Sequence, residues 1–108
     1  MFTYNDMITA TACEPGVSRK VLSYSPDVMM CELHFQKGAV GNTHKHPHTQ
    51  VTYIEKGSFR FTIGDETREV HKGDSVLMPP DVLHGTVALE EDSMLVDVFT
   101  PMRKEFLI

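Results

Sequence analysis

Basic clusters, long apolar runs and paired cysteines are scarce in this 108-residue sequence, and each scarcity excludes a class of function. Ten Lys and Arg residues against 15 Asp and Glu give a formal net charge of -5, and the basic residues are scattered. Because nucleic-acid binding needs a basic surface that neutralises phosphates, we expect no nucleic-acid partner. No apolar stretch approaches the length of a membrane span, so we expect no membrane partner either.

The two cysteines, Cys13 and Cys31, are too few and too far apart for a disulfide framework or a paired-cysteine zinc motif. We expect free thiols. Cys31 lies in the middle of an apolar strand pattern, where a small buried hydrophobe is the ordinary interpretation. The first residues show no positively charged leader before an apolar run, which predicts a cytoplasmic protein.

Helix signals are also nearly absent, and from about residue 18 the apolar residues follow a period of two. Gly, Pro and Asp clusters interrupt this pattern about every ten residues, which predicts an all-β sandwich or barrel. Gly64-Asp65 predicts a two-residue hairpin turn. We interpret residues 1–17 as a lead-in segment that can add an edge strand, and the length predicts one domain over residues 1–108. The expected strands cover residues 20–24, 28–36, 50–55, 58–63, 66–71, 75–78, 86–89 and 94–99.

Histidines are concentrated in residues 43–50, which hold three of the six. Side chains alternate along a strand, so His44 and His46 project to the same side, and His48 and Gln50 follow if the alternation continues. Two imidazoles about 7 Å apart on one face can bind one ion. The alternative is a solvated, histidine-rich loop.

Two stretches of the sequence resemble the two motifs of the cupin family. The first, at about residues 38–57, has Gly38, His44-x-His46, Gln50 and Gly57, with Gln in place of the usual Glu. The second, at about residues 73–88, has Gly73, Pro79 and His84. The motifs follow in the expected order, with a spacer of about fifteen residues that accommodates the predicted hairpin. This resemblance implies a small single-domain cupin, which is a double-stranded β-helix or jelly-roll barrel.

The second motif departs from the family pattern at two positions that do not bind metal. Asp81 replaces the usual Gly, and Ala88 replaces the usual terminal Asn. Asp tolerates the left-handed turn conformation, so we expect the turn to be retained. His34 and His71 lie outside the motifs, and we expect them to be strand-surface or packing residues.

The resemblance implies one divalent metal ion. By position, the family's ligands fall on His44, His46, Gln50 and His84. Three imidazoles and an amide oxygen are all neutral, so the ion keeps a positive charge that favours an anionic ligand. These donor types do not choose among zinc, nickel, iron, cobalt and manganese.

Asp97 interrupts an otherwise apolar strand near the end of the sequence. A charged residue at such a position needs a partner or a function, because burial of an unpaired carboxylate is costly. Asp97 shares a face with Phe99 by alternation, and Arg103 follows beyond a proline. Two alternatives are open: Asp97 points to solvent while Val96 and Val98 fill the core, and Arg103 is a surface residue.

The whole sequence resembles the single-domain cupins of the pectin-degradation KdgF type. The resemblance rests on both motifs and on a distinctive ending, residues 97–103. That family opens the ring of 4,5-unsaturated uronate monosaccharides, released by pectin or alginate lyases, to linear 4-deoxy-5-keto-uronates in an isomerase-type reaction. By position, the family's acid/base falls on Asp97 and its substrate contacts fall on Phe99 and Arg103. His48 is a further candidate for a substrate contact, with an ordinary surface histidine as the alternative.

The implied substrate is a small anionic sugar. Two other functions are open: a cupin oxygenase that holds iron on the same ligands, and a non-catalytic sugar-binding cupin. The apolar ending Phe106-Leu107-Ile108 is expected to pack on the barrel or on a partner subunit, which favours a homodimer.

Overall fold

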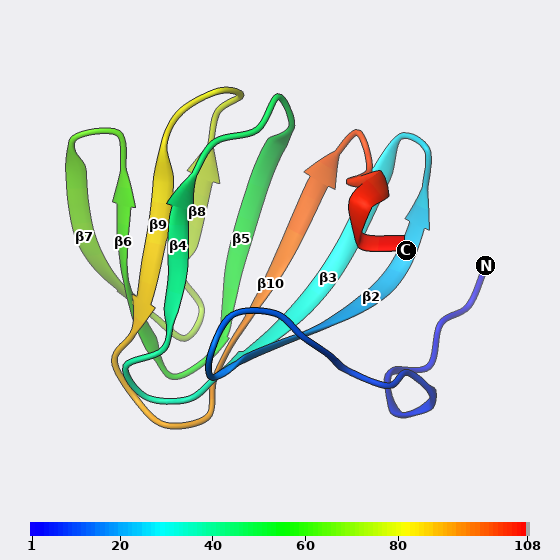
Figure 1. Cartoon of the computed structure of the whole chain (residues 1–108), viewed down its shortest axis with the longest axis horizontal. Coiled ribbons are helices and arrows are strands. Elements are labelled where there is room, and N and C mark those ends of the chain that lie inside the picture. Colours follow the sequence, from blue (N-terminus) through cyan, green and yellow to red (C-terminus); the bar gives the residue numbers. More distant parts are fainter. Residues whose placement is uncertain (108) are drawn as a thin grey trace.

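The computed structural model describes residues 1–107 as two antiparallel sheets that face each other (Figure 1). The larger sheet has the order β1-β2-β3-β10-β5-β8, and the smaller has the order β4-β9-β6-β7. The expected all-β fold is therefore confirmed. The strands are β1 (Thr11–Ala12), β2 (Val17–Ser25), β3 (Val28–Phe35), β4 (Val40–His44), β5 (Thr49–Lys56), β6 (Ser58–Ile63), β7 (Glu66–His71), β8 (Ser75–Met78), β9 (His84–Ala88) and β10 (Ser93–Thr100).

Turns form where the sequence predicts them. Strands β6 and β7 pair through Ile63 and Glu66, so Gly64 and Asp65 form the expected two-residue hairpin turn. Gly64 has a φ of 60°, a left-handed conformation that glycine adopts without a steric cost. Asp81 adopts a φ of 61°, which confirms that Asp serves where the family usually has Gly.

Strand β4 is a correction to the expected strands, because no strand was assigned to residues 40–44. All five residues are exposed or half-buried and show no apolar alternation, so the sequence pattern gives no signal. The strand forms through backbone pairing with β9, in which His44 lies opposite His84. Strand β9 also begins earlier than expected, at His84, and this pairing brings two motif histidines together.

The interior of the barrel is apolar at one end of strands β5 and β10 and polar toward the other. Phe35 and Phe59 meet edge to face at 5.1 Å between ring centroids, and both are buried in a cluster with Ile54 and Leu95. Full burial of one such side chain contributes about 1.5 to 3 kcal/mol. Further along β5 and β10, the residues on the same inner face are polar and also buried. These residues are Gln50, Thr52 and Asp97.

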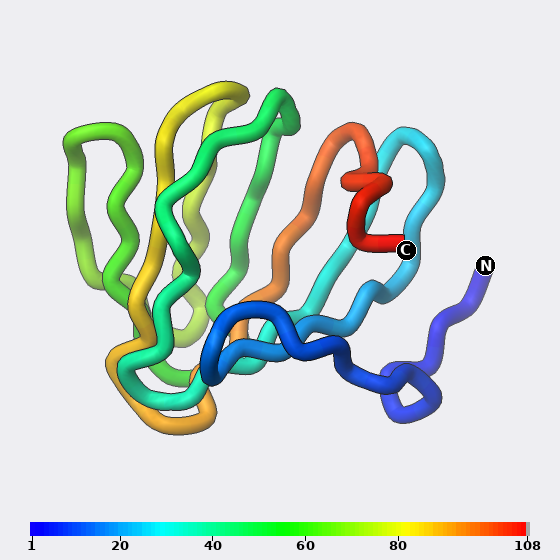
Figure 2. The backbone as a smooth tube through the Cα atoms, in the orientation of Figure 1, coloured from blue at the N-terminus to red at the C-terminus, as the bar shows by residue number. Residues whose placement is uncertain are grey.

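Both ends of the chain run beside the β2 side of the larger sheet (Figure 2). Strand β1 pairs with β2, as suggested for the lead-in segment. Two short 3-10 helices, η1 (Asn5–Met7) and η2 (Lys104–Leu107), flank the strands. Neither of these helices, in the part of the chain described, is long and apolar enough to cross a membrane.

Free thiols are confirmed for both cysteines. Cys31 is fully buried beside Met29 and Phe99, whereas Cys13 is exposed. Burial raises the pKa of the Cys31 thiol to about 12, so this thiol stays protonated and unreactive in the folded protein.

Candidate functional site

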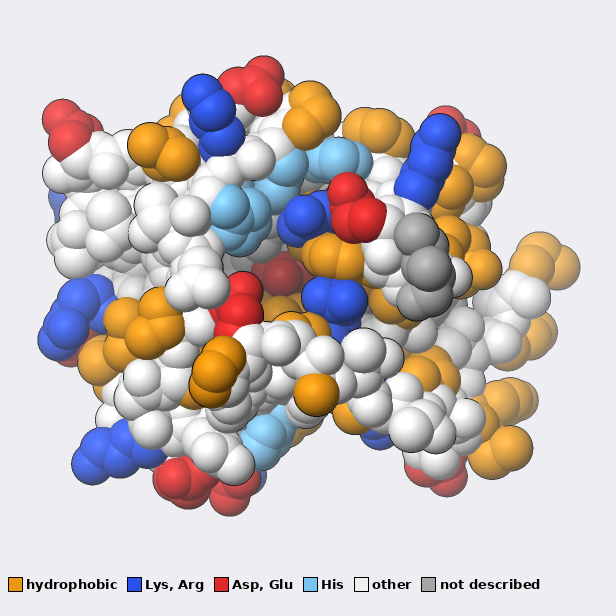
Figure 3. All heavy atoms as spheres, viewed as in Figure 1, with side chains coloured by type: hydrophobic (Ala, Val, Ile, Leu, Met, Phe, Trp, Pro, Cys, Tyr) orange, Lys and Arg blue, Asp and Glu red, His pale blue; other side chains and the backbone are white. Residues whose placement is uncertain are grey.

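A cavity of about 370 Å³ opens between the two sheets. Figure 3 shows a hollow in this face of the molecule, with histidine side chains along one side and Lys or Arg side chains close by. Predicted site residues from three separate parts of the sequence line this cavity. They are His44, Gln50, His84, Asp97, Phe99 and Arg103.

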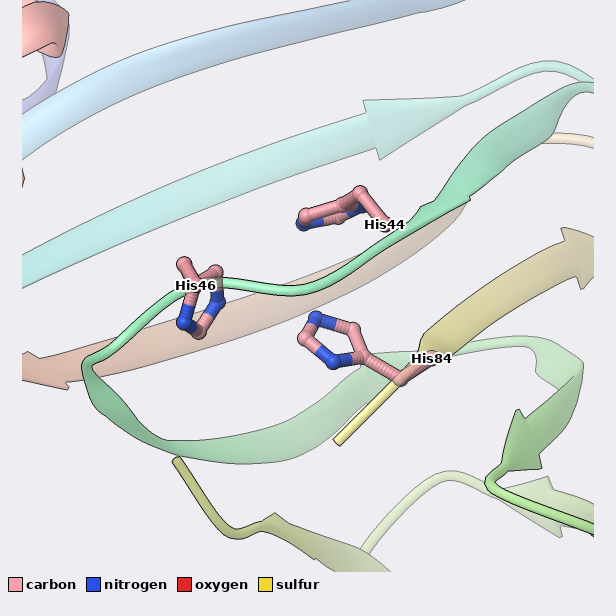
Figure 4. A group of neighbouring side chains, drawn as sticks. All are labelled: His44, His46 and His84. Atoms are coloured by element: carbon pink, nitrogen blue, oxygen red, sulfur yellow. The ribbon is translucent and has the colours of Figure 1, made fainter. Parts of the chain in front are cut away.

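Three imidazoles surround a common space beside the cavity (Figure 4). His44 ends β4, His46 lies in the connection to β5, and His84 begins β9. Their ligating nitrogen atoms lie within 4.8 Å of one another, which is close enough for one ion. The structure therefore brings together the three predicted histidines of the two motifs.

Each of these rings is oriented by a backbone carbonyl two residues away. A carbonyl oxygen only accepts, so each Nδ1 carries the hydrogen and each Nε2 keeps a lone pair for a metal. Such outer contacts fix both the ring orientation and the tautomer of metal-binding histidines. The Nδ1–carbonyl distances are 2.7 Å from His44 to Asn42, 3.2 Å from His46 to His48 and 3.0 Å from His84 to Val82.

Two contacts test whether these residues fit a cation. The buried Nε2 atom of His84 has no hydrogen-bond partner within residues 1–107. The Nε2 atom of His46 lies 2.9 Å from Oε1 of Gln50, although both atoms are acceptors in this arrangement. The Gln50 amide cannot simply be reversed, because its Nε2 donates to Asp97 and Thr52. Two acceptors that face each other are stabilised by a cation between them, so the site fits a metal ion.

Close packing of β4 against β9 sets the spacing of the ligands. A Cβ atom added at Gly85 would lie 2.8 Å from Oγ1 and 3.1 Å from Cα of Thr43, so only glycine allows this approach. Gly85 directly follows His84, and Thr43 directly precedes His44. Burial lowers the pKa of His84 to about 4, so its ring is neutral and able to bind a metal at neutral pH.

Asp97 faces the interior, so the interpretation that it points to solvent is wrong. It is 7% exposed, while Val96 and Val98 on the other face are half-buried. Its Oδ1 accepts hydrogen bonds from Gln50 Nε2 at 2.9 Å and from Thr52 Oγ1 at 2.5 Å. Burial raises the pKa of Asp97 to about 6, although both hydrogen bonds oppose this increase.

The remaining predicted residues lie at different depths. Arg103 is half-buried at the cavity wall, with its Cζ 5.3 Å from the centroid of the Phe99 ring. His48 is not among the residues that line the cavity. Its Nε2 lies 3.2 Å from the carbonyl oxygen of Met102. A substrate contact of His48 therefore stays a prediction.

The sequence analysis missed two polar residues on the inner faces of strands. Thr52 lies two positions after Gln50 and donates its hydroxyl hydrogen to Asp97. Arg19 lines the cavity from β2. The sequence does carry a signal for Arg19, which stands between Val17 and Val21 at alternate positions of a strand. Asp97 stands between Leu95 and Phe99 in the same way. The signal for Arg19 was overlooked because the expected strand began at residue 20.

A jelly-roll barrel with a histidine triad inside it defines a class of protein, and the cupin domain profile matches residues 31–99. The chain belongs to the cupin family. It is 44% identical over 93 residues to the pectin degradation protein KdgF of Dickeya dadantii, a match that covers 85% of this chain and 84% of that protein.

Two solved structures resemble the whole chain. KdgF from Halomonas sp. superimposes with a TM-score of 0.95 and 36% identity, over 98% of this chain and 97% of that one. An RmlC-like cupin from Shewanella frigidimarina gives a TM-score of 0.92 and 31% identity, over 97% and 94%. The resemblance to the KdgF type that the motifs indicated is confirmed.

The buried carboxyl group predicts a pH-dependent stability difference. In metal-free protein, we expect the stability of Asp97→Asn relative to wild type to increase on the order of 2 kcal/mol between pH 4 and pH 8. The pKa of Asp97 is raised from 3.8 to about 6, so the folded state binds this proton more tightly than the unfolded state. This tighter proton binding stabilises the folded wild type below pH 4, and the stabilisation is lost as the pH rises through 6. The amide of Asp97→Asn does not titrate, so the variant shows no such loss. Urea unfolding at pH 4 and 8 measures the difference, and an equal difference at both pH values contradicts the prediction.

Proposed function

We propose that this protein opens the ring of 4,5-unsaturated uronate monosaccharides, in the breakdown of pectin or alginate, to give 4-deoxy-5-keto-uronates. The observation that carries the proposal is the position of Asp97. It is a buried carboxyl group with a pKa raised to about 6, in a cavity that is also lined by His44, His84 and Arg103. The names of the two KdgF relatives, one of them a pectin degradation protein, support this substrate class.

The reaction is an isomerisation that needs proton transfer and charge neutralisation. The bond between C1 and the ring oxygen breaks, the anomeric hydroxyl loses its proton to become an aldehyde, and C5 becomes an enol. Protonation of C4, with loss of the proton from the enol oxygen, then gives the 5-ketone. No oxidant or reductant enters, so one group that both accepts and donates a proton is sufficient.

Asp97 is suited to this proton transfer because its pKa lies near neutral pH. Thr52 and Gln50 donate hydrogen bonds to one of its oxygens, which holds the carboxyl group in place and leaves the second oxygen for the substrate. Arg103 presents a guanidinium group that can bind the substrate carboxylate. We propose His44, His46, Gln50 and His84 as the ligands of a divalent ion, which supplies Lewis-acid stabilisation of negative charge on oxygen when bound.

The direct assay follows the ultraviolet absorbance of the double bond conjugated with the carboxylate. Unsaturated galacturonate from a pectin lyase should lose this absorbance faster with metal-loaded protein than in buffer alone, without any redox partner. Oxygen consumption during turnover would indicate the oxygenase alternative. If neither the galacturonate-derived nor the mannuronate-derived sugar reacts faster than its spontaneous rate, the proposal is wrong and the binding-module alternative is favoured.

Replacement of Arg103 should affect substrate binding more than chemistry. We expect Arg103→Ala to raise KM on the order of tenfold or more, because a charge-assisted hydrogen bond to the carboxylate is lost, and to change kcat much less. Steady-state kinetics with unsaturated galacturonate measure both constants. Arg68→Ala, an exposed residue of β7, is the matched control. A lowered kcat with an unchanged KM contradicts the assigned role.

We also propose that the protein acts in the cytoplasm as a homodimer. An apolar row crosses four strands on the outer face of the larger sheet, because Met30, Val98, Val51 and Leu77 are successive partners in the strand register. Three of these four side chains are at least 40% exposed. Phe106, by contrast, packs on the barrel beside Phe99, and Ile108 lies outside the described residues. The apolar row is therefore the stronger argument for a dimer.

A charge within this row is expected to separate the subunits. Val51→Lys should shift the mass measured by light scattering from two chains to one, because a lysine is costly to bury in an apolar interface. Gln36→Lys, in an exposed turn, should leave the mass unchanged. A wild-type protein that is monomeric at all concentrations contradicts the proposal.

A further inference from the structure

Arg19 is a charged residue on the inner face of the larger sheet. It lies on β2 between Val17 and Val21, and its strand partners are Thr11 of β1 and Leu33 of β3. Its side chain is half-buried and lines the cavity that contains Asp97 and the histidines. Within residues 1–107, no carboxylate lies within 4 Å of its guanidinium group. A half-buried cation without a counterion is costly unless a ligand supplies the negative charge.

The ring of Phe106 contacts the guanidinium groups of both Arg19 and Arg103. The Cζ atom of Arg19 lies 3.7 Å from the centroid of the Phe106 ring, and that of Arg103 lies 4.3 Å from the same centroid. Stacking on an aromatic ring orders a guanidinium group and partly offsets its charge. Arg103 is also held at 3.3 Å by Glu105, whereas Arg19 has no such partner among the residues that the structure describes.

Other charged groups line the same cavity and do not neutralise Arg19. Lys45 adds a further positive charge. Glu14 also contributes to the lining, but its Oε2 accepts a hydrogen bond from the backbone N–H of Asn42 on β4. The same cavity is therefore lined by two guanidinium groups and by the imidazoles of His44 and His84.

We propose that Arg19 is a specificity-determining residue that binds the carboxylate of a uronate together with Arg103, on a platform formed by Phe106. A guanidinium group is a planar donor that matches a carboxylate in geometry and charge, and two such groups lie on one ring at the wall of this cavity. A neutral sugar of the same size leaves both cations without a partner, so the clamp selects uronates over neutral hexoses. The inference rests on the proposed function only for the class of substrate, an anionic sugar.

Binding of a saturated sugar tests this role separately from catalysis. Galacturonate lacks the double bond and cannot undergo the reaction, and galactose is its neutral counterpart. We expect NMR titration of metal-loaded wild type to show tighter binding of galacturonate than of galactose. Arg19→Met should weaken galacturonate binding on the order of tenfold or more, because charge-assisted hydrogen bonds are lost, and should leave galactose binding nearly unchanged. Arg68→Met, an exposed residue already paired with Glu66, should behave as wild type.

A lysine variant keeps the proposal testable if Arg19→Met does not fold. Arg19→Lys retains the charge but not the planar fork, so it should also weaken galacturonate binding, to a smaller extent. Unchanged galacturonate affinity in either folded variant overturns the proposal, as does an equal loss for galactose. The two proposals can fail separately. If no unsaturated uronate is turned over, the proposed reaction is wrong. The role of Arg19 still holds if wild type binds galacturonate more tightly than galactose and Arg19→Met does not.

Discussion

Asp97→Asn is expected to lower kcat for unsaturated galacturonate by on the order of a hundredfold or more, with metal content and fold retained. The amide is nearly isosteric with the carboxyl group, and its oxygen can still accept hydrogen bonds from Gln50 and Thr52. It cannot accept and return a proton, so the variant removes the acid/base and little else. Steady-state kinetics on metal-loaded protein measure the loss.

Two controls separate catalysis from structure in this experiment. Elemental analysis should show equal metal in wild type and Asp97→Asn, because Asp97 is not a proposed ligand. Asp92→Asn changes an exposed carboxyl group that contacts His34 on the molecular surface, and it should retain wild-type turnover. Wild-type activity in metal-replete Asp97→Asn contradicts the catalytic role and leaves Asp97 as a structural residue.

His84→Ala is expected to reduce bound metal from about one ion per chain to a small fraction of that. The variant removes a buried imidazole whose Nε2 has no protein partner among the described residues and whose neutral form is favoured by burial. Two histidines and an amide remain, which is too few for tight binding. Elemental analysis after gel filtration measures the stoichiometry.

An exposed histidine provides the comparison for that variant. His71 lies on β7, outside the triad, and His71→Ala should keep the wild-type stoichiometry. A chelator should lower the melting temperature of wild type and of His71→Ala but not that of His84→Ala, because only proteins that bind the ion are stabilised by it. Unchanged metal in His84→Ala contradicts the ligand set.

The fold was predictable wherever the buried face leaves a pattern in the sequence. Alternation identified β5, β6 and β10, and the glycine turn identified the β6–β7 hairpin. Strand β4 escaped detection because it is held by backbone pairing with β9 while its side chains remain largely exposed. Exposed strands show no apolar periodicity, so sequence patterns do not reveal them.

The candidate site was predictable from residues that break the local pattern. His44 and His46 were identified by their spacing, His84 by the resemblance to the second cupin motif, and Asp97 by its position in an apolar strand. The hydrogen bonds from Gln50 and Thr52 to Asp97 depend on the register between β5 and β10, which the sequence does not specify. The contact between Arg19 and Phe106 joins positions 87 residues apart in the chain and was equally inaccessible.

Proton NMR of unsaturated galacturonate in the presence of metal-loaded protein tests the central proposal most directly. We predict that the signal of the vinyl hydrogen on C4 disappears faster than in buffer alone, while signals of a saturated C4 next to a ketone appear in equal amount. Metal-free wild type and metal-loaded Asp97→Asn should both approach the spontaneous rate. A vinyl signal that decays at the spontaneous rate with metal-loaded protein, for both the galacturonate-derived and the mannuronate-derived sugar, contradicts the proposed function.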